Sequence, residues 1–350
     1  MIDFLPHLYE DELFYSFVAR YITFGGKKTD LLISEKVKPN PLFVNMLTQD
    51  AVKNISAYKN FKDIIFEHTM LPCYLRLLPL NERKKYFKVI VKNNGIMDIF
   101  MRRYVDIKDI KHSLNYCPMC VKKDREIFGE TYWHCTHQIQ GIDVCPVHKC
   151  FLTKIIISDN AFITAEDSAR YIDAKYCYES FKNMYAEYLS FVFHLPLDFS
   201  HHLHIKNFIQ SNFPNGFFYD SERIFINSQP FCDDLSGKNK YIFNNYFDTQ
   251  SLIRKLFFDA VPFQFDEFCL LITMFNISFD DVKLFLTGNS NLILNSSCRL
   301  IPENEILRMF KNQCSVYDIS ISLNIPIWLV LSVLRNYFGQ KYLVSNKIII

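Results

Sequence analysis

The chain lacks an apolar run long enough to cross a membrane. Its longest apolar stretches, such as residues 325–331, fall far short of the about 20 residues that a membrane-spanning helix needs. A signal peptide is not visible either, because the opening MIDFLPHLYEDELFYS carries acids where a basic region and then an apolar one would stand. We therefore expect a cytoplasmic protein with no membrane partner.

The motifs of several enzyme classes are also missing. No Gly-x4-Gly-Lys-Ser/Thr segment is present, which excludes a phosphate-binding loop of that type. His134 and His137 come without the glutamate of a metalloprotease motif. The aspartate pairs at 233–234 and 280–281 fit a loop and a helix start better than the carboxylate cluster of a nuclease. We expect no catalytic activity.

The composition is that of an ordinary globular protein. Hydrophobic residues make up 49% and charged residues 22% of the 350 residues, with only nine glycines, which excludes a disordered or collagen-like chain. This length suggests two or three domains and allows a large core without disulfides. The 11 cysteines are then available for metal binding, because a reducing cytoplasm disfavours disulfides.

Positive charge is concentrated in one block, although the net charge is only +2. Residues 81–123 carry eleven basic and four acidic side chains, a net charge of +7. A localised basic block is typical of a surface that binds an anionic polymer such as nucleic acid. The alternative is a solvated helical face on which lysines only provide solubility.

Apolar residues recur at helical spacing along most of the chain. The pattern predicts helices over 11–21, 61–68, 80–91, 303–312, 316–323 and 327–337, and two helices joined near Asn276 within 262–285. The last three helices have the spacing of a trihelical helix-turn-helix, and a glycine turn at 25–26 allows a second such unit near the start. The expected fold is mainly α, multi-domain and helical, with helix-turn-helix units and a small Cys3His zinc-finger region.

The strongest motif is CPMC at 117–120 followed by CPVH at 145–148. Two ligands separated by two residues can bind one ion from a single tight turn, and two such knuckles complete the tetrahedron of a structural zinc. We predict that one structural Zn2+ is held by Cys117, Cys120, Cys145 and His148. Four ligands leave no open position for catalysis.

Other side chains near the knuckles leave alternatives open. Four of them carry donor atoms that could substitute as ligands, namely Cys135, Cys150, His134 and His137. We expect the two histidines to form local hydrogen bonds or to face phosphate. Tyr132 and Trp133 are expected to pack over the knuckles.

Three segments resemble the TniQ/TnsD family. They are the knuckle stretch 116–152, the opening 5–21 with its Asp-Glu-Leu and Ser-x-x-Ala-Arg, and 66–74, which resembles the TnsD branch in particular. Residues 262–338 are similar, more loosely, to the helical C-terminal part of TnsD-type members. The resemblance implies the same four metal ligands. We expect a single zinc, because the apolar stretch 151–157 stands where RNA-guided members often carry a second knuckle.

The resemblance implies a target-site selector of a TnsABC-type cut-and-paste transposon. Such a protein binds double-stranded target DNA sequence-specifically and recruits the AAA+ ATPase TnsC, without being the nuclease or the ATPase. It would work in the bacterial cytoplasm, associated with the nucleoid. The alternative is a TniQ-type adaptor that links a CRISPR guide-RNA effector complex to TnsC without sequence specificity of its own. Residues 66–74 favour the selector, whereas the modest chain length favours the adaptor.

We expect four domains: 1–110, N-terminal helical TniQ domain; 111–160, zinc-finger region; 161–260, helical middle domain; 261–350, C-terminal helical domain with a helix-turn-helix. Basic residues flanking the first knuckle are the candidates for phosphate contacts, namely Arg102, Arg103, Lys111, Lys122 and Lys123. The less apolar face of the last predicted helix offers side chains for base reading, namely Trp328, Ser332, Arg335 and Asn336. A buried bundle helix or a protein-contacting helix explains that last segment nearly as well.

Overall fold

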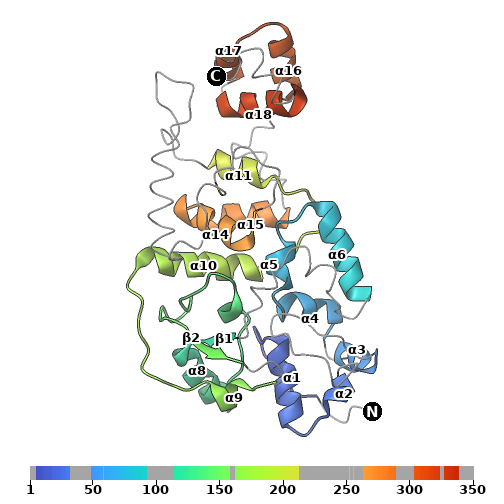
Figure 1. The fold of residues 1–350 in the computed structure, drawn as a ribbon, viewed down its shortest axis with the longest axis vertical. Coiled ribbons are helices and arrows are strands. Elements are labelled where there is room, and N and C mark those ends of the chain that lie inside the picture. Colours follow the sequence, from blue (N-terminus) through green and yellow to red (C-terminus); the bar gives the residue numbers. More distant parts are fainter. Residues whose placement is uncertain are drawn as a thin grey trace. The chain divides into compact units, whose positions relative to one another are not determined.

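The computed structural model describes residues 5–31, 49–57, 59–92, 113–157, 162–212, 252, 255, 263–288, 303–323 and 327–338. Most of these residues lie in helices, as predicted, and the described strands form one two-stranded sheet (Figure 1). The chain divides into two compact units, one of residues 1–205 with 262–288 and one of 206–261 with 289–350. The four-domain division stays a prediction. None of the helices in the described ranges combines the length and the apolar character needed to cross a bilayer.

The N-terminal part of the first unit is helical. Its helices are α1 (Phe14–Thr23), α2 (Lys28–Leu31), α3 (Gln49–Ser56), α4 (Phe61–Glu67), α5 (Leu71–Leu75) and α6 (Leu80–Lys92). The helices predicted over 61–68 and 80–91 are confirmed. Helix α1 begins later than predicted, because Asp11 has a positive φ of 57° and Glu12 forms a β-bridge with His134. Gly25, with φ of 94°, follows its end, as expected for a residue that must leave the helical conformation.

Residues 113–157, called here the knuckle region, form strands and helices around the two knuckles. Strand β1 (Ser113–Tyr116) pairs antiparallel with β2 (Thr153–Ile156), and between them stand α8 (Pro118–Phe128) and the short 3-10 helix η2 (Thr136–Gln138). Helix α8 was not among the predicted helices. Cys117 caps its start by accepting a hydrogen bond from the amide of Cys120, and Gly129 ends it with φ of 80°.

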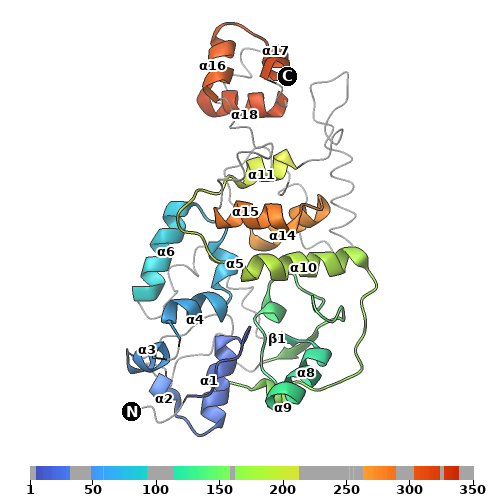
Figure 2. The same cartoon turned by 180° about the vertical axis from the view of Figure 1, so that it is seen from behind.

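Helix α10 (Ser180–His194) joins the knuckle region to the remaining helices of the first unit. It lies between the knuckle region and the pair α14 (Phe265–Met274) and α15 (Phe279–Thr287) in both views (Figures 1 and 2). The hydroxyl of Tyr185 donates to the carbonyl of Asp266 at 3.3 Å, and that of Tyr188 donates to the carbonyl of Ile277. The break predicted near Asn276 is confirmed, since Asn276 has φ of 49°. The short α9 (Ala165–Ser168) precedes α10.

Two buried arginines hold the chain that follows α10. Arg76 donates to the carbonyls of Phe193, Leu195 and Pro196. The last carbonyls of a helix have no partner within the helix, and Arg76 supplies one to Phe193 in the last turn of α10. Arg83 donates to the carbonyls of Asp198 and His201, both at 2.6 Å. Arg83 is only 1% exposed, so this member of the basic block is a structural residue and offers no charge to a polyanion.

The described part of the second unit contains α11 (Ile205–Ser211), which begins at the unit boundary, and three C-terminal helices. These are α16 (Glu303–Lys311), α17 (Val316–Leu323) and α18 (Ile327–Phe338), which confirms the three helices predicted there. They enclose a small core of Ile306, Ile319, Val330, Val333 and Leu334. Ser315 caps α17, because its hydroxyl accepts from the amide of Asp318 at 3.1 Å. Residues 324–326, between α17 and α18, lie outside the described residues.

Candidate metal centre

The four predicted ligands converge. The donor atoms of Cys117, Cys120, Cys145 and His148 all lie within 4.8 Å of one another. The Nδ1 atom of His148 is 3.5, 3.3 and 3.6 Å from the sulfurs of Cys117, Cys120 and Cys145 respectively. The three cysteines are buried and His148 is partly exposed. The first knuckle follows directly after β1 and the second lies before β2, so the pairing of the two strands brings the knuckles together.

The chemistry of this donor set suits one metal ion. Three thiols and one imidazole are soft and borderline donors in the number that a closed tetrahedral site requires. Each knuckle turns so that an amide donates to the first sulfur: Cys120 N lies 3.4 Å from the sulfur of Cys117, and His148 N lies 3.4 Å from that of Cys145. Hydrogen bonds from the Cys120, Cys145 and Cys150 side chains lower the pKa of the Cys117 thiol, which favours the thiolate form that binds metals.

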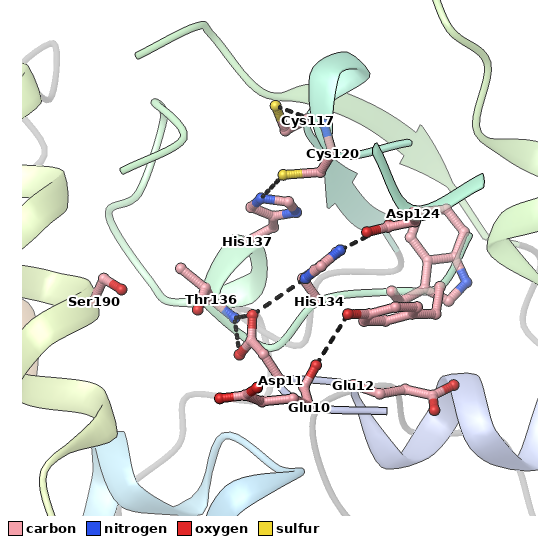
Figure 3. Close-up of polar contacts among 12 residues, drawn as sticks. Glu10, Asp11, Glu12, Cys117, Cys120, Asp124, His134, Thr136, His137 and Ser190 are labelled. Atoms are coloured by element: carbon pink, nitrogen blue, oxygen red, sulfur yellow. Dashed lines mark hydrogen bonds and ion pairs between the residues drawn. The ribbon is translucent and has the colours of Figure 1, made fainter. Parts of the chain in front are cut away.

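Two of the four alternative donors lie beside this cluster. The sulfur of Cys150 is 3.3 Å from that of Cys117. Nε2 of His137 is 3.7 Å from the sulfur of Cys120 (Figure 3). Burial lowers the pKa of His137 to about 4, with a further contribution from His134, so its ring is neutral at pH 7. With its proton on Nε2, His137 donates to the sulfur of Cys120. Outer hydrogen bonds of this kind orient ligands and tune a metal site.

His134 lies instead between two carboxylates. Its Nε2 is 2.9 Å from Asp124 and its Nδ1 is 3.3 Å from Asp11 (Figure 3). Burial alone would lower the pKa of His134, but hydrogen bonds to Asp11 and Asp124 raise it to about 9. Asp11 also lies 3.3 Å from Nε2 of His194 at the end of α10. This charged cluster therefore ties the knuckle region to the residues before α1 and to α10.

The His134 ion pairs should make stability depend on pH. Because the pKa of His134 is higher in the folded chain (about 9) than its usual value (about 6.5), the imidazolium stabilises the fold fully below pH 6.5, and this stabilisation disappears as pH rises through 9. We expect His134→Gln to lower the melting temperature by several degrees at pH 6 and much less at pH 9.5. Thermal denaturation of both proteins across this range checks it. His202→Gln, at an exposed position, is the control, and a difference independent of pH would contradict the assignment.

The Asp-Glu-Leu and Ala-Arg residues of the opening motif form a second buried cluster. Arg20 donates through Nη1 to both carboxylate oxygens of Glu12, at 3.0 and 3.1 Å, and through Nη2 to Glu130 at 2.6 Å. Its guanidinium lies 4.3 Å from the ring centre of Tyr9. Burial raises the pKa of Glu12 to about 7 even though Arg20 opposes the shift. No role was predicted for these residues from the sequence, and their spacing alone does not reveal that Glu130 joins them.

The segments that carry the family resemblance meet around Glu12 and Leu13. Leu13 N donates to the carbonyl of Trp133 and Phe14 N to that of His68, both at 2.7 Å. The ring of His68 donates through Nδ1 to the carbonyl of Glu12 at 2.6 Å, because Nε2 accepts from Lys59. The opening 5–21, residues 66–74 and the knuckle region therefore share one buried junction.

Tyr132 and Trp133 belong to the same junction. Trp133 is fully buried, its amide donates to the hydroxyl of Ser16 at 3.1 Å, and its indole donates to the carbonyl of Ile163 at 2.9 Å. The ring of Tyr132 stacks on that of Tyr9 with centres 4.9 Å apart. The structure thus places both residues between the knuckle region and the N-terminal segment.

The predicted DNA contacts fall partly on described residues. Lys122 and Lys123 are exposed on α8, and Lys122 lies 3.9 Å from Glu126, a loose surface pair. Three others lie outside the described residues, namely Arg102, Arg103 and Lys111. The remaining four lie on α18, which is described without their side chains, namely Trp328, Ser332, Arg335 and Asn336. All of these contacts stay predictions.

Comparison with known proteins points to the same part of the chain. Residues 4–152 match the model of the TniQ family. The transposon Tn7 transposition protein TnsD of Escherichia coli is 22% identical over 151 residues, which are 41% of this chain and 30% of TnsD. The matched stretch thus spans less than a third of that relative. The family match ends within the knuckle region and contains both knuckles and the junction around Glu12.

Proposed function

Because residues 4–152 make this chain a member of the TnsD/TniQ family, we propose that it selects insertion sites for a TnsABC-type cut-and-paste transposon. In this proposal it binds double-stranded target DNA sequence-specifically, in the bacterial cytoplasm and on the nucleoid, and recruits the AAA+ ATPase TnsC. The observation that carries it is the junction around Glu12, where the three family-like segments become one buried unit with the knuckles. The chain has no catalytic role in this proposal.

The metal in this proposal is one structural Zn2+. Its ligands would be Cys117, Cys120, Cys145 and His148, whose converging donor atoms supply four protein ligands. A site closed by four protein ligands offers no position for a reacting water. The ion would therefore fix α8 and the second knuckle against each other and would leave chemistry to other proteins.

Phosphate contacts would supply much of the affinity for DNA. The exposed Lys122 and Lys123 of α8 follow directly after the first knuckle, so the metal would hold them in place. Helix α18 is proposed as the base-reading helix of a helix-turn-helix. Its residues Val330, Val333 and Leu334 are buried. The residues proposed to contact the bases are Trp328, Ser332, Arg335 and Asn336.

Charge reversal of Arg102 and Arg103 should weaken DNA binding equally for all sequences. The slope of log K against log salt is negative, and each lost phosphate contact makes it less steep by about 0.9. The slope of the double variant should therefore be less steep by about 2. Fluorescence anisotropy titrations at several salt concentrations measure it. Lys53→Glu with Lys62→Glu, two exposed lysines outside the basic block, is the matched control. A loss confined to one sequence would mean that the arginines read bases.

The function itself is tested by selecting bound fragments from genomic DNA with the purified protein at physiological salt. Recovery of one defined site is expected of a target-site selector. Recovery of unselected DNA, or of none, would contradict sequence-specific binding. It would favour the adaptor of a guide-RNA effector complex, for which co-purification with that complex and with TnsC is the next measurement.

A further inference from the structure

The proposed metal centre has a fifth sulfur or nitrogen donor at contact distance, the thiol of Cys150. Its sulfur lies 3.3 Å from that of Cys117, whereas the sulfurs of Cys120 and Cys145 are 3.9 Å apart. We propose that Cys150 is a reserve ligand: its S–H donates to the Cys117 thiolate while four ligands hold the ion, and its sulfur binds the ion when Cys117 is lost. This inference rests on the metal centre proposed above and is independent of DNA binding.

The backbone holds Cys150 against the cluster. Lys149 has a positive φ of 54°, which turns the chain back toward the first knuckle directly after His148. The carbonyl of Cys150 accepts from the amide of Cys145 at 2.8 Å, and the carbonyl of Lys149 accepts from the amide of Cys177 at 2.7 Å. Cys150 is 0% exposed, so its thiol has no position in water to occupy instead. The sulfur is therefore fixed in place before any exchange of ligands.

The distances suit an exchange with Cys117. For Zn–S bonds of about 2.3 Å, two sulfurs on one tetrahedral ion lie about 3.8 Å apart. The sulfurs of Cys117 and Cys150 are closer than this, so both cannot be ideal ligands of one ion without moving apart. They fit a thiolate with a thiol donating to it, and Cys150 needs only a small shift to reach the position that Cys117 leaves.

Among the described residues, the contact that the sulfur of Cys120 makes outside the four predicted ligands is to a ring nitrogen and not to a second thiol, Nε2 of His137 at 3.7 Å. The two cysteines of the first knuckle should therefore respond differently to the same substitution. In Cys117→Ser, which has no Cys117 sulfur, the Cys150 thiol would lose its proton to water and its sulfur would bind the ion in the place that the Cys117 sulfur takes in the native chain, with the charge of the metal unchanged.

Cobalt(II) in place of zinc tests this with the full chain, because sulfur-to-cobalt charge transfer and the tetrahedral d–d bands report the ligands directly. Cys117→Ser should bind one cobalt with a tetrahedral, three-thiolate spectrum like that of the wild type. Cys120→Ser should lose the tetrahedral spectrum. Cys117→Ser with Cys150→Ser should lose it as well, whereas Cys117→Ser with Cys135→Ser, which removes a buried thiol outside the cluster, should keep it.

The single variant Cys150→Ser gives a second measurement. Loss of an outer hydrogen bond should weaken metal affinity about ten-fold in a competition with a chelator, with the spectrum unchanged. If Cys117→Ser loses the tetrahedral spectrum as Cys120→Ser does, or fails to fold with excess cobalt, the proposal is overturned. A wild-type chain that binds neither cobalt nor zinc would overturn the metal centre itself, and a chain that binds metal but selects no DNA would affect only the proposed function.

Discussion

Cys120→Ser should release the metal ion and unfold the knuckle region. The apparent binding free energy of structural zinc in zinc-finger peptides is about 10–16 kcal/mol at pH 7, and much of it is free energy of folding. Serine does not replace a thiolate as a zinc ligand, and Cys120 is only 9% exposed, so water does not fill the place without rearrangement. Purified Cys120→Ser should carry far less than one zinc per chain by elemental analysis.

The same variant should show where the metal acts. Limited proteolysis should cut within α8 and the second knuckle, because the ion joins these two elements. The core of α16, α17 and α18 belongs to the other compact unit and should keep its protection. Cys314→Ser, a cysteine packed beside that core, is the control and should retain one zinc. A folded, protease-resistant Cys120→Ser chain without metal would disprove a structural role for the ion.

Arg20→Met should destabilise the first unit by about 3–5 kcal/mol, the usual cost of removing one partner from a buried ion pair. Arg20 is 3% exposed, and its loss leaves Glu12, which is 0% exposed, without its countercharge. The carbonyl of His7 and the carboxylate of Glu130 lose the hydrogen bonds that Arg20 donates to them, although Glu130 still accepts from the hydroxyl of Tyr9. Urea denaturation followed by circular dichroism measures the change in the free energy of unfolding.

Two comparisons separate the ion pair from the loss of packing. Arg170→Met removes an exposed arginine and should change stability by less than about 0.5 kcal/mol. Combining Arg20→Met with Glu12→Gln should recover part of the loss, since the second substitution removes the unpaired buried charge. If Arg20→Met alone is as stable as Arg170→Met, the cluster around Glu12 does not hold the opening segment to the knuckle region.

Local patterns in the sequence carried much of the information about this protein. The spacing within CPMC and CPVH was enough to choose the four side chains that converge, because two ligands in one turn leave little freedom for alternatives. Apolar periodicity was enough for α4, α6 and the three C-terminal helices, since each buries one face. The break near Asn276 was predicted as well, and Asn276 has a positive φ there. A serine cap, Ser315, begins α17.

Other features depend on residues far apart in the chain. Periodicity placed the start of the first helix at 11, but the positive φ of Asp11 and the pairing of Glu12 with His134 keep residues 11–13 out of the helix. Charge counting put Arg83 in a basic surface block, whereas the carbonyls after α10 bury it. The residues next to Glu12 and Arg83 in the sequence do not indicate that His134 and the carbonyls after α10 are their partners.

The sequence by itself determined the mainly helical class of fold, the similarity to the TniQ family over residues 4–152 and the four converging donors, because short spacing and periodic burial are properties of the local chain. Only the tertiary structure decided that His134 lies between Asp11 and Asp124, that Arg20 joins Glu12 to Glu130, and that Cys150 lies beside Cys117. Burial and charge pairing at these sites come from segments up to 183 residues apart, such as His194 and Asp11, and only folding brings such segments together.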